Sequence, residues 1–317
     1  MLDVYKSCYK LEGQPFRLSP DYRFSFHHPT YDEAMAYLKY ATSEGECFVV
    51  ITGAPGTGKT TLIAKLLAEL DTTHIKVATL ADEQLDSRNL VERVNDAFGV
   101  PEEHDVAPLP GLMRFLNQHK EQGGRAILIV DEAQGLTMEA LEEIRLLSNM
   151  QNYDGLLLQV VLLGQESLLE MIRSPGMEQL QQRLIAASHL EPLKLHETVA
   201  YVEHRLRKVG WQNDPSFTEE SMDLIHKFSG GVPRRINQFC SRLLLQGFTE
   251  SKQQLGREDV KEVLLQLARE MLEPGTIAEL RALPATDEEA VDPGGNAIGD
   301  IAIAAAAGAE KFIAGDG

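Results

Sequence analysis

Short apolar runs alternate with amphipathic stretches from Cys47 to Leu190. Continuously apolar runs are typical of strands buried on both faces of a parallel sheet, and the stretches between them repeat apolar residues with helical spacing. The predicted strands are 47–52, 75–80, 125–130, 157–163 and 187–190, and the predicted helices between them are 60–70, 84–98, 111–121 and 138–150. This alternation predicts a three-layer α/β sandwich on a five-stranded, mostly parallel sheet.

From Leu195 onward the strand-like runs stop and only helical patterns remain, at 195–209, 218–228, 233–248 and 257–272. Thr218 followed by two glutamates is typical of a helix start, and Gly230–Gly231 is typical of a helix end. We therefore expect four parts, which are an N-terminal segment at 1–46, an α/β nucleotide-binding domain at 47–193, an all-helical lid domain at 194–272 and a flexible tail at 273–317.

The tail is acidic and rich in alanine and glycine, without an apolar period, which favours a flexible segment. The whole chain carries 30 Lys+Arg against 48 Asp+Glu, a formal net charge of −18. Proteins that coat nucleic acid non-specifically need a basic surface, so this balance argues against that class. It does not exclude a local basic patch.

No apolar run approaches the roughly 18 residues that a transmembrane helix needs, and the N-terminus lacks the apolar core of a signal peptide. We therefore expect a cytoplasmic protein without a transmembrane segment. The three cysteines, Cys8, Cys47 and Cys240, lie far apart, which predicts neither a disulfide framework nor a clustered metal site.

A phosphate-binding loop is predicted between the first strand and the first helix of the sandwich. Residues 53–60 read GAPGTGKT and match G-x-x-x-x-G-K-[ST] in the strand–loop–helix context that this pattern requires. The glycines let backbone amides face phosphate oxygens, Lys59 brings charge to the β- and γ-phosphates, and the Thr60 hydroxyl is a ligand for Mg²⁺. The predicted ATP-binding residues are Gly53, Ala54, Pro55, Gly56, Thr57, Gly58, Lys59, Thr60 and Thr61.

Two adjacent carboxylates follow the apolar strand 125–130. Asp131 is placed to hold Mg²⁺ directly or through water, and Glu132 to polarise the attacking water. Having both favours a hydrolysing ATPase over a nucleotide-gated switch. The alternative is that Asp131 only caps the turn that follows.

Two polar residues near later strands are further candidates. Gln165 follows strand 157–163, between the phosphate-loop and acidic strands, where it would sense the γ-phosphate or orient the water, or only cap the next helix. Arg183 ends a helical stretch before the last strand. It would reach the nucleotide of a neighbouring subunit, or pair locally with Glu178 or Gln179.

Arg234 and Arg235 lie in the first turn of the predicted helix 233–248, where cations are disfavoured. A bound triphosphate would compensate the positive charge of Arg234 at this helix start. The alternative is that the arginines pair with an acidic surface such as Glu219–Glu220.

These motifs, in this order and spacing, resemble those of AAA+ ATPases. They are the phosphate loop, DEAQ at 131–134, LLGQ at 162–165, QQR at 181–183 and GGVPRRIN at 230–237. YKLEGQPFRLSPD at 9–21 and the phrases of the helical domain are most similar to general secretion pathway A-type ATPases and the shorter exosortase/PEP-CTERM-system-associated ATPases. The resemblance covers roughly residues 2–267. Secretion A-type relatives continue into a transmembrane helix and a cell-wall-binding domain that this chain lacks, so we expect the shorter type.

The resemblance implies a role for each candidate: Mg-ATP binding by Lys59, Thr60 and Asp131, general base catalysis by Glu132, first sensor for Gln165, trans-acting arginine finger for Arg183 and second sensor for Arg234. It also implies that the N-terminal segment forms part of the adenine pocket. The partners that it implies are further copies of the chain, in a ring or head to tail, and a membrane-associated export, protein-sorting or exopolysaccharide-assembly system. An ATPase acting there would be cytoplasmic or peripheral at the inner membrane.

Two other functions remain open from the sequence. One is a DNA-associated, ATP-dependent matchmaker resembling transposition-regulator ATPases, which would need a basic surface lining a ring pore. The other is a switch that hydrolyses ATP slowly and signals through the position of its lid.

Overall fold

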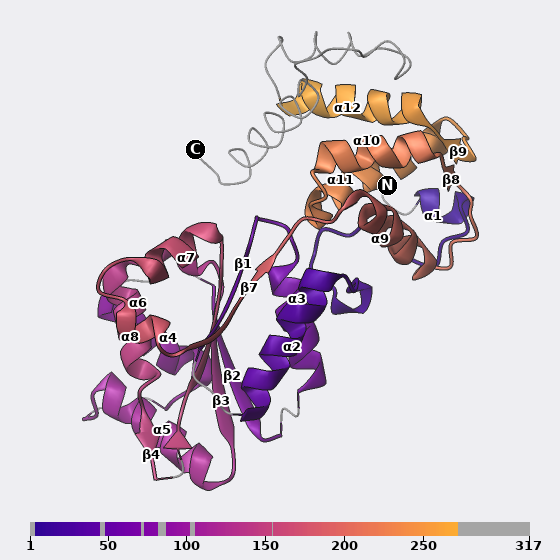
Figure 1. The fold of residues 1–317 in the computed structure, drawn as a ribbon. Coiled ribbons are helices and arrows are strands. Elements are labelled where there is room, and N and C mark those ends of the chain that lie inside the picture. The colour runs from indigo at the N-terminus through magenta and orange to yellow at the C-terminus, as the bar shows by residue number, and fades with distance from the viewer. Residues whose placement is uncertain are drawn as a thin grey trace. The chain divides into compact units, whose positions relative to one another are not determined.

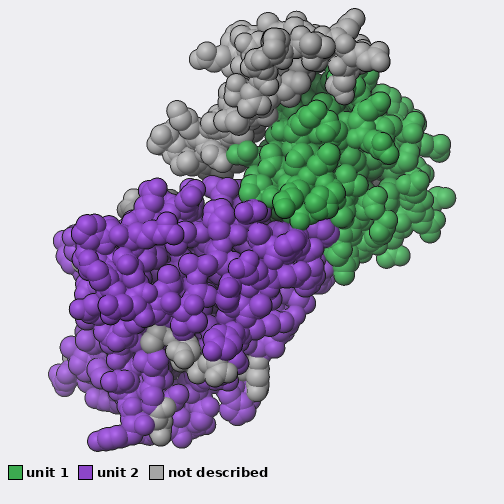
Figure 2. Space-filling model, in the orientation of Figure 1, with its two compact units in different colours: residues 1–19, 192–317 green, residues 20–191 purple. Residues whose placement is uncertain are grey.

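The computed structural model describes residues 4–44, 48–70, 73–81, 87–101, 105–153 and 155–271. Two compact units divide the chain, one formed by residues 20–191 and the other by residues 1–19 together with 192–317 (Figure 2). The predicted tail at 273–317 and Cys47 lie outside the described residues. We call residues 20–191 the α/β unit and the other the helical unit.

The α/β unit is built on five parallel strands in the order β2-β3-β6-β1-β7 (Figure 1). Their bounds are β1 Phe48–Gly53, β2 Ile75–Leu80, β3 Arg125–Val130, β6 Gln159–Gly164 and β7 Leu184–Leu190. The predicted fold class is confirmed, and the strands predicted at 75–80 and 125–130 have the observed bounds. The last strand starts three residues before its predicted start at 187.

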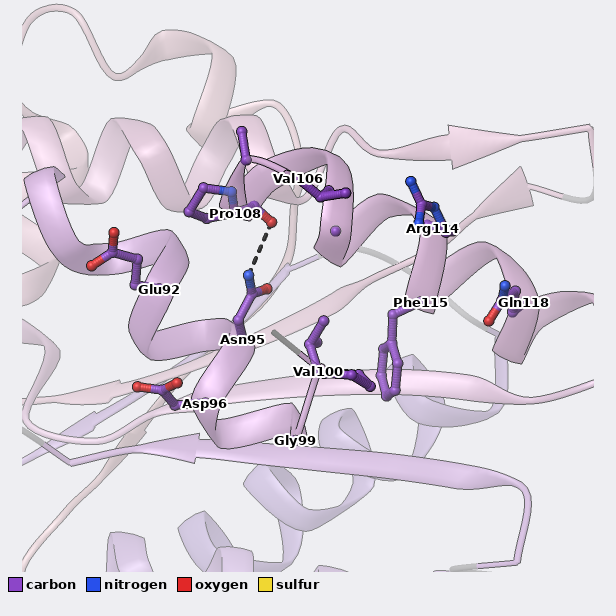
Figure 3. A pocket seen from close by; sticks show the side chains of 13 residues that line it. Glu92, Asn95, Asp96, Gly99, Val100, Val106, Pro108, Arg114, Phe115 and Gln118 are labelled. Atoms are coloured by element: carbon purple, nitrogen blue, oxygen red, sulfur yellow. Dashed lines mark hydrogen bonds between the residues drawn. The ribbon is translucent and has the colours of Figure 1, made fainter. Parts of the chain in front are cut away.

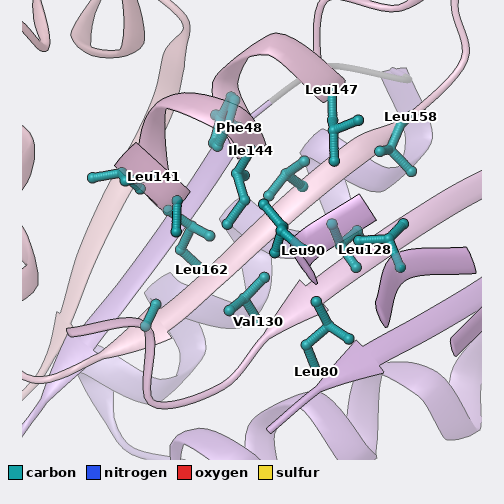
Figure 4. Packing of buried hydrophobic residues seen from close by; sticks show 14 of the residues in the cluster. Phe48, Leu80, Leu90, Leu128, Val130, Leu141, Ile144, Leu147, Leu158 and Leu162 are labelled. Atoms are coloured by element: carbon teal, nitrogen blue, oxygen red, sulfur yellow. The ribbon is translucent and has the colours of Figure 1, made fainter. Parts of the chain in front are cut away.

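Helices cover both faces of this sheet (Figure 1). Alternate residues of β1 point to opposite faces, so Phe48 and Val50 join one apolar cluster while Val49 and Ile51 join the other. Figure 4 shows the first cluster, which packs the sheet against α4 to α8. The second cluster packs it against α2 and α3. The result is the predicted sandwich of three layers.

The four helices whose bounds the sequence predicts in the α/β unit are present, but each differs from its predicted bounds at one end or at both. Described helices and turns are η1 Tyr22–Phe24, α2 Pro29–Glu44, α3 Lys59–Glu69, α4 Ser87–Phe98, α5 Pro108–Glu121, η2 Ala133–Gly135, α6 Met138–Leu147, α7 Glu166–Arg173 and α8 Glu178–Gln181. A two-residue hairpin, β4 Gln151–Asn152 and β5 Gly155–Leu156, separates α6 from β6. The sequence pattern missed α2 and this hairpin, and it predicted a helix after Gln165 without giving the bounds of α7.

The helical unit contains α1 Val4–Cys8, α9 Leu195–Arg207, α10 Glu219–Ser229, α11 Pro233–Thr249 and α12 Arg257–Met271. The expectation of an all-helical domain is wrong in one detail, because β8 Ser216–Phe217 pairs in parallel with β9 Gln254–Leu255. These short strands lead into α10 and α12 and bring the two helix starts together. The predicted cap is confirmed, since Thr218 Oγ1 accepts a hydrogen bond from the Ser221 amide at 3.2 Å.

The N-terminal segment 1–46 is divided between the two units at residues 19 and 20. Its first part is anchored in the helical unit through Arg205, which is buried. Arg205 Nε donates to the Pro15 carbonyl at 2.6 Å, and an Nη atom donates to the Tyr201 hydroxyl at 2.8 Å. That hydroxyl donates in turn to Asn237 Oδ1 at 2.9 Å. One buried guanidinium therefore connects α9, α11 and the N-terminal segment.

We expect Arg205→Ala to lower the free energy of unfolding by about 2–4 kcal/mol, because it leaves buried acceptors without their donor. Arg207→Ala on the same helix is the matched control. Its partner is Glu203 and its side chain is 67% exposed, so its loss should cost less than about 1 kcal/mol. Urea denaturation measures both, and equal effects would contradict the anchoring role.

Candidate nucleotide-binding site

The phosphate loop, Asp131, Glu132 and Gln165 gather at the carboxyl edge of the sheet, whereas Arg183 directly precedes β7 and lies at the opposite, amino edge. In a parallel sheet all strands end at the same edge, and ligands bind outside it. Strand β6 lies between β1 and β3, as the position of Gln165 required. The phosphate loop after β1, Gln165 after β6 and Asp131 after β3 therefore follow three neighbouring strands.

The phosphate loop is shaped by glycines at both ends. A Cβ atom on Gly53 would lie 2.8 Å from the Leu190 carbonyl oxygen and 2.7 Å from Thr57 Oγ1, so a side chain does not fit there. Gly58, directly before α3, has φ 106°, a conformation that residues with a side chain rarely adopt. Between them, the Thr57 hydroxyl donates to the Ala54 carbonyl at 2.9 Å and closes the loop.

Lys59 curls back over this loop and is buried. Its Nζ donates to the carbonyls of Gly53 at 2.9 Å and Ala54 at 3.3 Å. Burial lowers the pKa of Lys59 below the ordinary 10.5, although the charges of Glu132 and Asp131 act in the opposite direction. A buried ammonium held by neutral carbonyls is incompletely compensated, and an anion such as a polyphosphate would complete the compensation.

The two predicted metal-ligating residues are in direct contact. Thr60 Oγ1 donates to Asp131 Oδ2 at 2.9 Å, and Asp131 Oδ1 accepts from the Glu132 amide at 2.9 Å. A hydroxyl and a carboxylate oxygen side by side are the hard donors that Mg²⁺ prefers. The pair fits a magnesium ion that a nucleotide would bring.

Glu132 has a left-handed backbone, with φ 52° and ψ 37°, which costs a residue with a side chain on the order of 1–3 kcal/mol. Its Oε2 accepts a hydrogen bond from Gln134 Nε2 at 2.7 Å, and Gln134 Oε1 accepts from the Gln165 amide at 3.0 Å. Gln134 was missed as a functional candidate. The only signal for it was its place at the end of DEAQ.

Gln165 is the N-cap residue directly before α7, but its side chain makes no capping hydrogen bond. The alternative that its side chain serves as a helix cap therefore has no support. A role in sensing the γ-phosphate stays a prediction.

Arg183 lies in the turn between α8 and β7, half-buried. Its side chain makes no hydrogen bond or ion pair with any residue that the structure describes, whereas Glu178, its proposed local partner, accepts from the Gly176 amide at 3.2 Å. Arg234 is exposed in the first turn of α11, in the helical unit, and likewise has no such partner among the described ranges. Their predicted roles toward a nucleotide stay predictions.

A separate pocket of about 770 Å³ lies between α4 and α5 (Figure 3). Arg114 and Phe115 line it, and Asn95 Nδ2 donates to the Pro108 carbonyl at 2.9 Å on its wall. None of the predicted site residues lines this pocket. It is not the predicted nucleotide site.

Comparison with known proteins agrees with the resemblance of the motifs. Residues 42–172 match the family model of an AAA domain. The chain is 36% identical over 261 residues to general secretion pathway protein A of Aeromonas hydrophila, and the match covers 81% of this chain. It covers 47% of the relative, so the chain spans about half the length of that protein.

Solved structures are similar in fold. Cdc6p from Pyrobaculum aerophilum has a TM-score of 0.66 at 16% identity, over 84% of this chain and 73% of that one. The RuvB Holliday junction branch migration motor of Thermotoga maritima has a TM-score of 0.54 at 16% identity, over 83% of this chain and 77% of that one. Likeness at this level of identity concerns the fold alone. The exosortase-associated subtype stays a prediction.

We expect the protein to take up a proton from solvent, at the amine of Lys59, when it binds a nucleotide at alkaline pH. Phosphates beside Lys59 favour its charged form and so raise its lowered pKa. Between the two pKa values the free protein lacks a proton that the complex holds, so ATP affinity falls as pH rises through that window. Calorimetric titration in alkaline buffers of different ionisation enthalpy counts the proton. Lys65 is on the same helix and its amine pairs with Glu69, so the control variant Lys65→Ala should keep the proton uptake. An ATP affinity that does not change with pH in the alkaline range would contradict the assignment of Lys59.

Proposed function

The chain belongs to the AAA+ ATPases and is related to general secretion pathway protein A, and from this premise we propose that it hydrolyses ATP with Mg²⁺ to drive a membrane-associated, secretion-type system. The observation that carries the proposal is the contact of Thr60 with Asp131, which joins the phosphate loop to the acidic strand. Glu132 stands next to this contact, with its carboxylate held by a hydrogen bond.

Each residue of this edge has a role in the proposed reaction. Lys59 and the amides of the loop bind the β- and γ-phosphates. Gly53 lets the loop pack against Leu190 and Thr57, where a side chain would not fit. Thr60 and Asp131 would hold Mg²⁺, and the bound ion would supply positive charge that stabilises the phosphates. Glu132 orients a water for in-line attack on the γ-phosphorus and accepts its proton. Gln165, which follows the strand between them, contacts the γ-phosphate.

The proposal includes assembly with further copies of the chain. Arg183 is half-buried and has no partner for its guanidinium among the described residues. An arginine of this kind stabilises transition-state charge when it reaches a neighbouring subunit's nucleotide, an effect of roughly 10³–10⁵ in rate. We also propose Arg234 as a second arginine that contacts the nucleotide.

The setting of the activity is inferred from the relative, which is named for a secretion pathway. No helix in the described ranges is long and apolar enough to cross a membrane. We propose that the chain acts with membrane-associated export, protein-sorting or polysaccharide machinery.

We expect Glu132→Gln to bind ATP with affinity within about threefold of the original chain and to lose hydrolysis by about 10²–10⁴-fold, because the amide cannot accept the proton of water. The exposed Glu139→Gln on α6 is the control and should retain hydrolysis. Phosphate release and fluorescent-nucleotide titration measure the two properties. Equal loss of binding and hydrolysis would contradict the role as base.

Arg183→Ala should bind ATP and lose most of its turnover. Mixing it with Glu132→Gln should restore activity, since a subunit with intact Arg183 then faces a subunit with intact Glu132. Phosphate release over a series of mixing ratios measures the rescue. Turnover that stays at the sum of the separate variants at every ratio would remove the trans role.

A further inference from the structure

We propose that Gln134 is a positioning residue, which aims the carboxylate of Glu132 and connects it to the end of β6. The inference rests on the proposed ATPase function. It concerns a residue that neither the motif assignments nor the predicted site includes, and it makes the DEAQ glutamine part of the hydrolytic apparatus.

The side-chain amide of Gln134 makes a contact at each of its polar atoms. Nε2 donates to Glu132 Oε2 at 2.7 Å, and Oε1 accepts from the Gln165 amide at 3.0 Å. An ionised carboxylate only accepts and a backbone N–H only donates, so the two partners fix which way the amide faces. A glutamate at 134 would present an acceptor to Glu132, and an alanine would present nothing.

Both ends of this bridge are held by the fold. Gln134 sits in η2, which is closed by the Gly135 amide donating to the Glu132 carbonyl at 2.9 Å, and Ala133 beside it is fully buried. At the other end, a Cβ on Gly164 would lie 2.9 Å from Gln134 Oε1. The absence of a side chain at 164 is therefore what admits the amide to the end of β6.

The hydrogen bonds of the Gln134 side chain hold Glu132 and do not involve the phosphate loop or Asp131, which we propose to bind the nucleotide and Mg²⁺. Lys59 is held by loop carbonyls and Thr60 by Asp131, and within the part of the chain that the structure describes neither side chain is hydrogen-bonded to Gln134. A glutamate side chain has several rotatable bonds, so removal of its donor frees the carboxylate to leave the attack geometry. Because the Gln165 backbone holds the other end, a shift of Gln165 on contact with the γ-phosphate would be passed to Glu132.

The test compares kcat and KM for Gln134→Ala and Gln134→Glu. We expect kcat to fall by about 10–100-fold in Gln134→Ala, because misplacement of a catalytic group by about 1 Å costs rates of this order, with KM for ATP unchanged within about threefold. Gln134→Glu should lose at least as much, because its carboxylate faces that of Glu132. The exposed Gln122→Ala, at the end of α5, is the control and should keep kcat.

A double-mutant cycle separates positioning from a general structural role. In the Glu132→Gln background, Gln134→Ala should change the residual rate by less than about threefold, since the carboxylate that it positions is gone. The full loss in that background, or an unchanged kcat in the single variant, would overturn the proposal while leaving the ATPase function in place. A chain that shows ATP binding without any hydrolysis would overturn both.

Discussion

The candidate site depends on the order and direction of five strands. Because all of them run parallel, the loops that follow β1, β3 and β6 leave the same edge of the sheet. Because β6 is inserted between β1 and β3, the phosphate loop and the acidic pair stand one strand apart, and the Thr60 hydroxyl spans that separation to Asp131. The apolar clusters on the two faces hold this arrangement without contributing chemistry of their own.

Polar groups at this edge are kept in states that they would not adopt on a free surface. Lys59 is buried with its pKa lowered, and Glu132 has a left-handed backbone. Both features cost free energy, and packing and hydrogen bonds from neighbouring elements offset that cost. Such costs are concentrated at functional sites, where the geometry serves binding or reaction. A nucleotide would relieve the first of them, since its phosphates supply the charge that the ammonium lacks.

The sequence was sufficient to predict the features that depend on a local pattern of residues, which are the strands of the sheet and the phosphate loop. Short β-type runs, several of them continuously apolar, located every strand of the sheet. The loop GAPGTGKT, and DE after a buried strand, indicated Lys59, Thr60 and Asp131 from the sequence alone. Contacts between segments that lie far apart in the chain could not be predicted from the sequence. Residues 1–19 join the helical unit through Arg205, and nothing in their own pattern signals a partner almost two hundred residues away. Gln134 was also hidden, because its role depends on a missing side chain at Gly164.

ATP hydrolysis at the edge formed by the phosphate loop and the acidic pair is the reaction that we propose for this chain. Phosphate release by the unmodified chain, measured with Mg²⁺ and with a chelator over a range of protein concentration, tests it most directly. We expect release that requires Mg²⁺ and a rate per chain that rises with concentration as subunits meet. Bound ATP that stays intact at every concentration, with Mg²⁺ present, would contradict the account and favour a nucleotide switch.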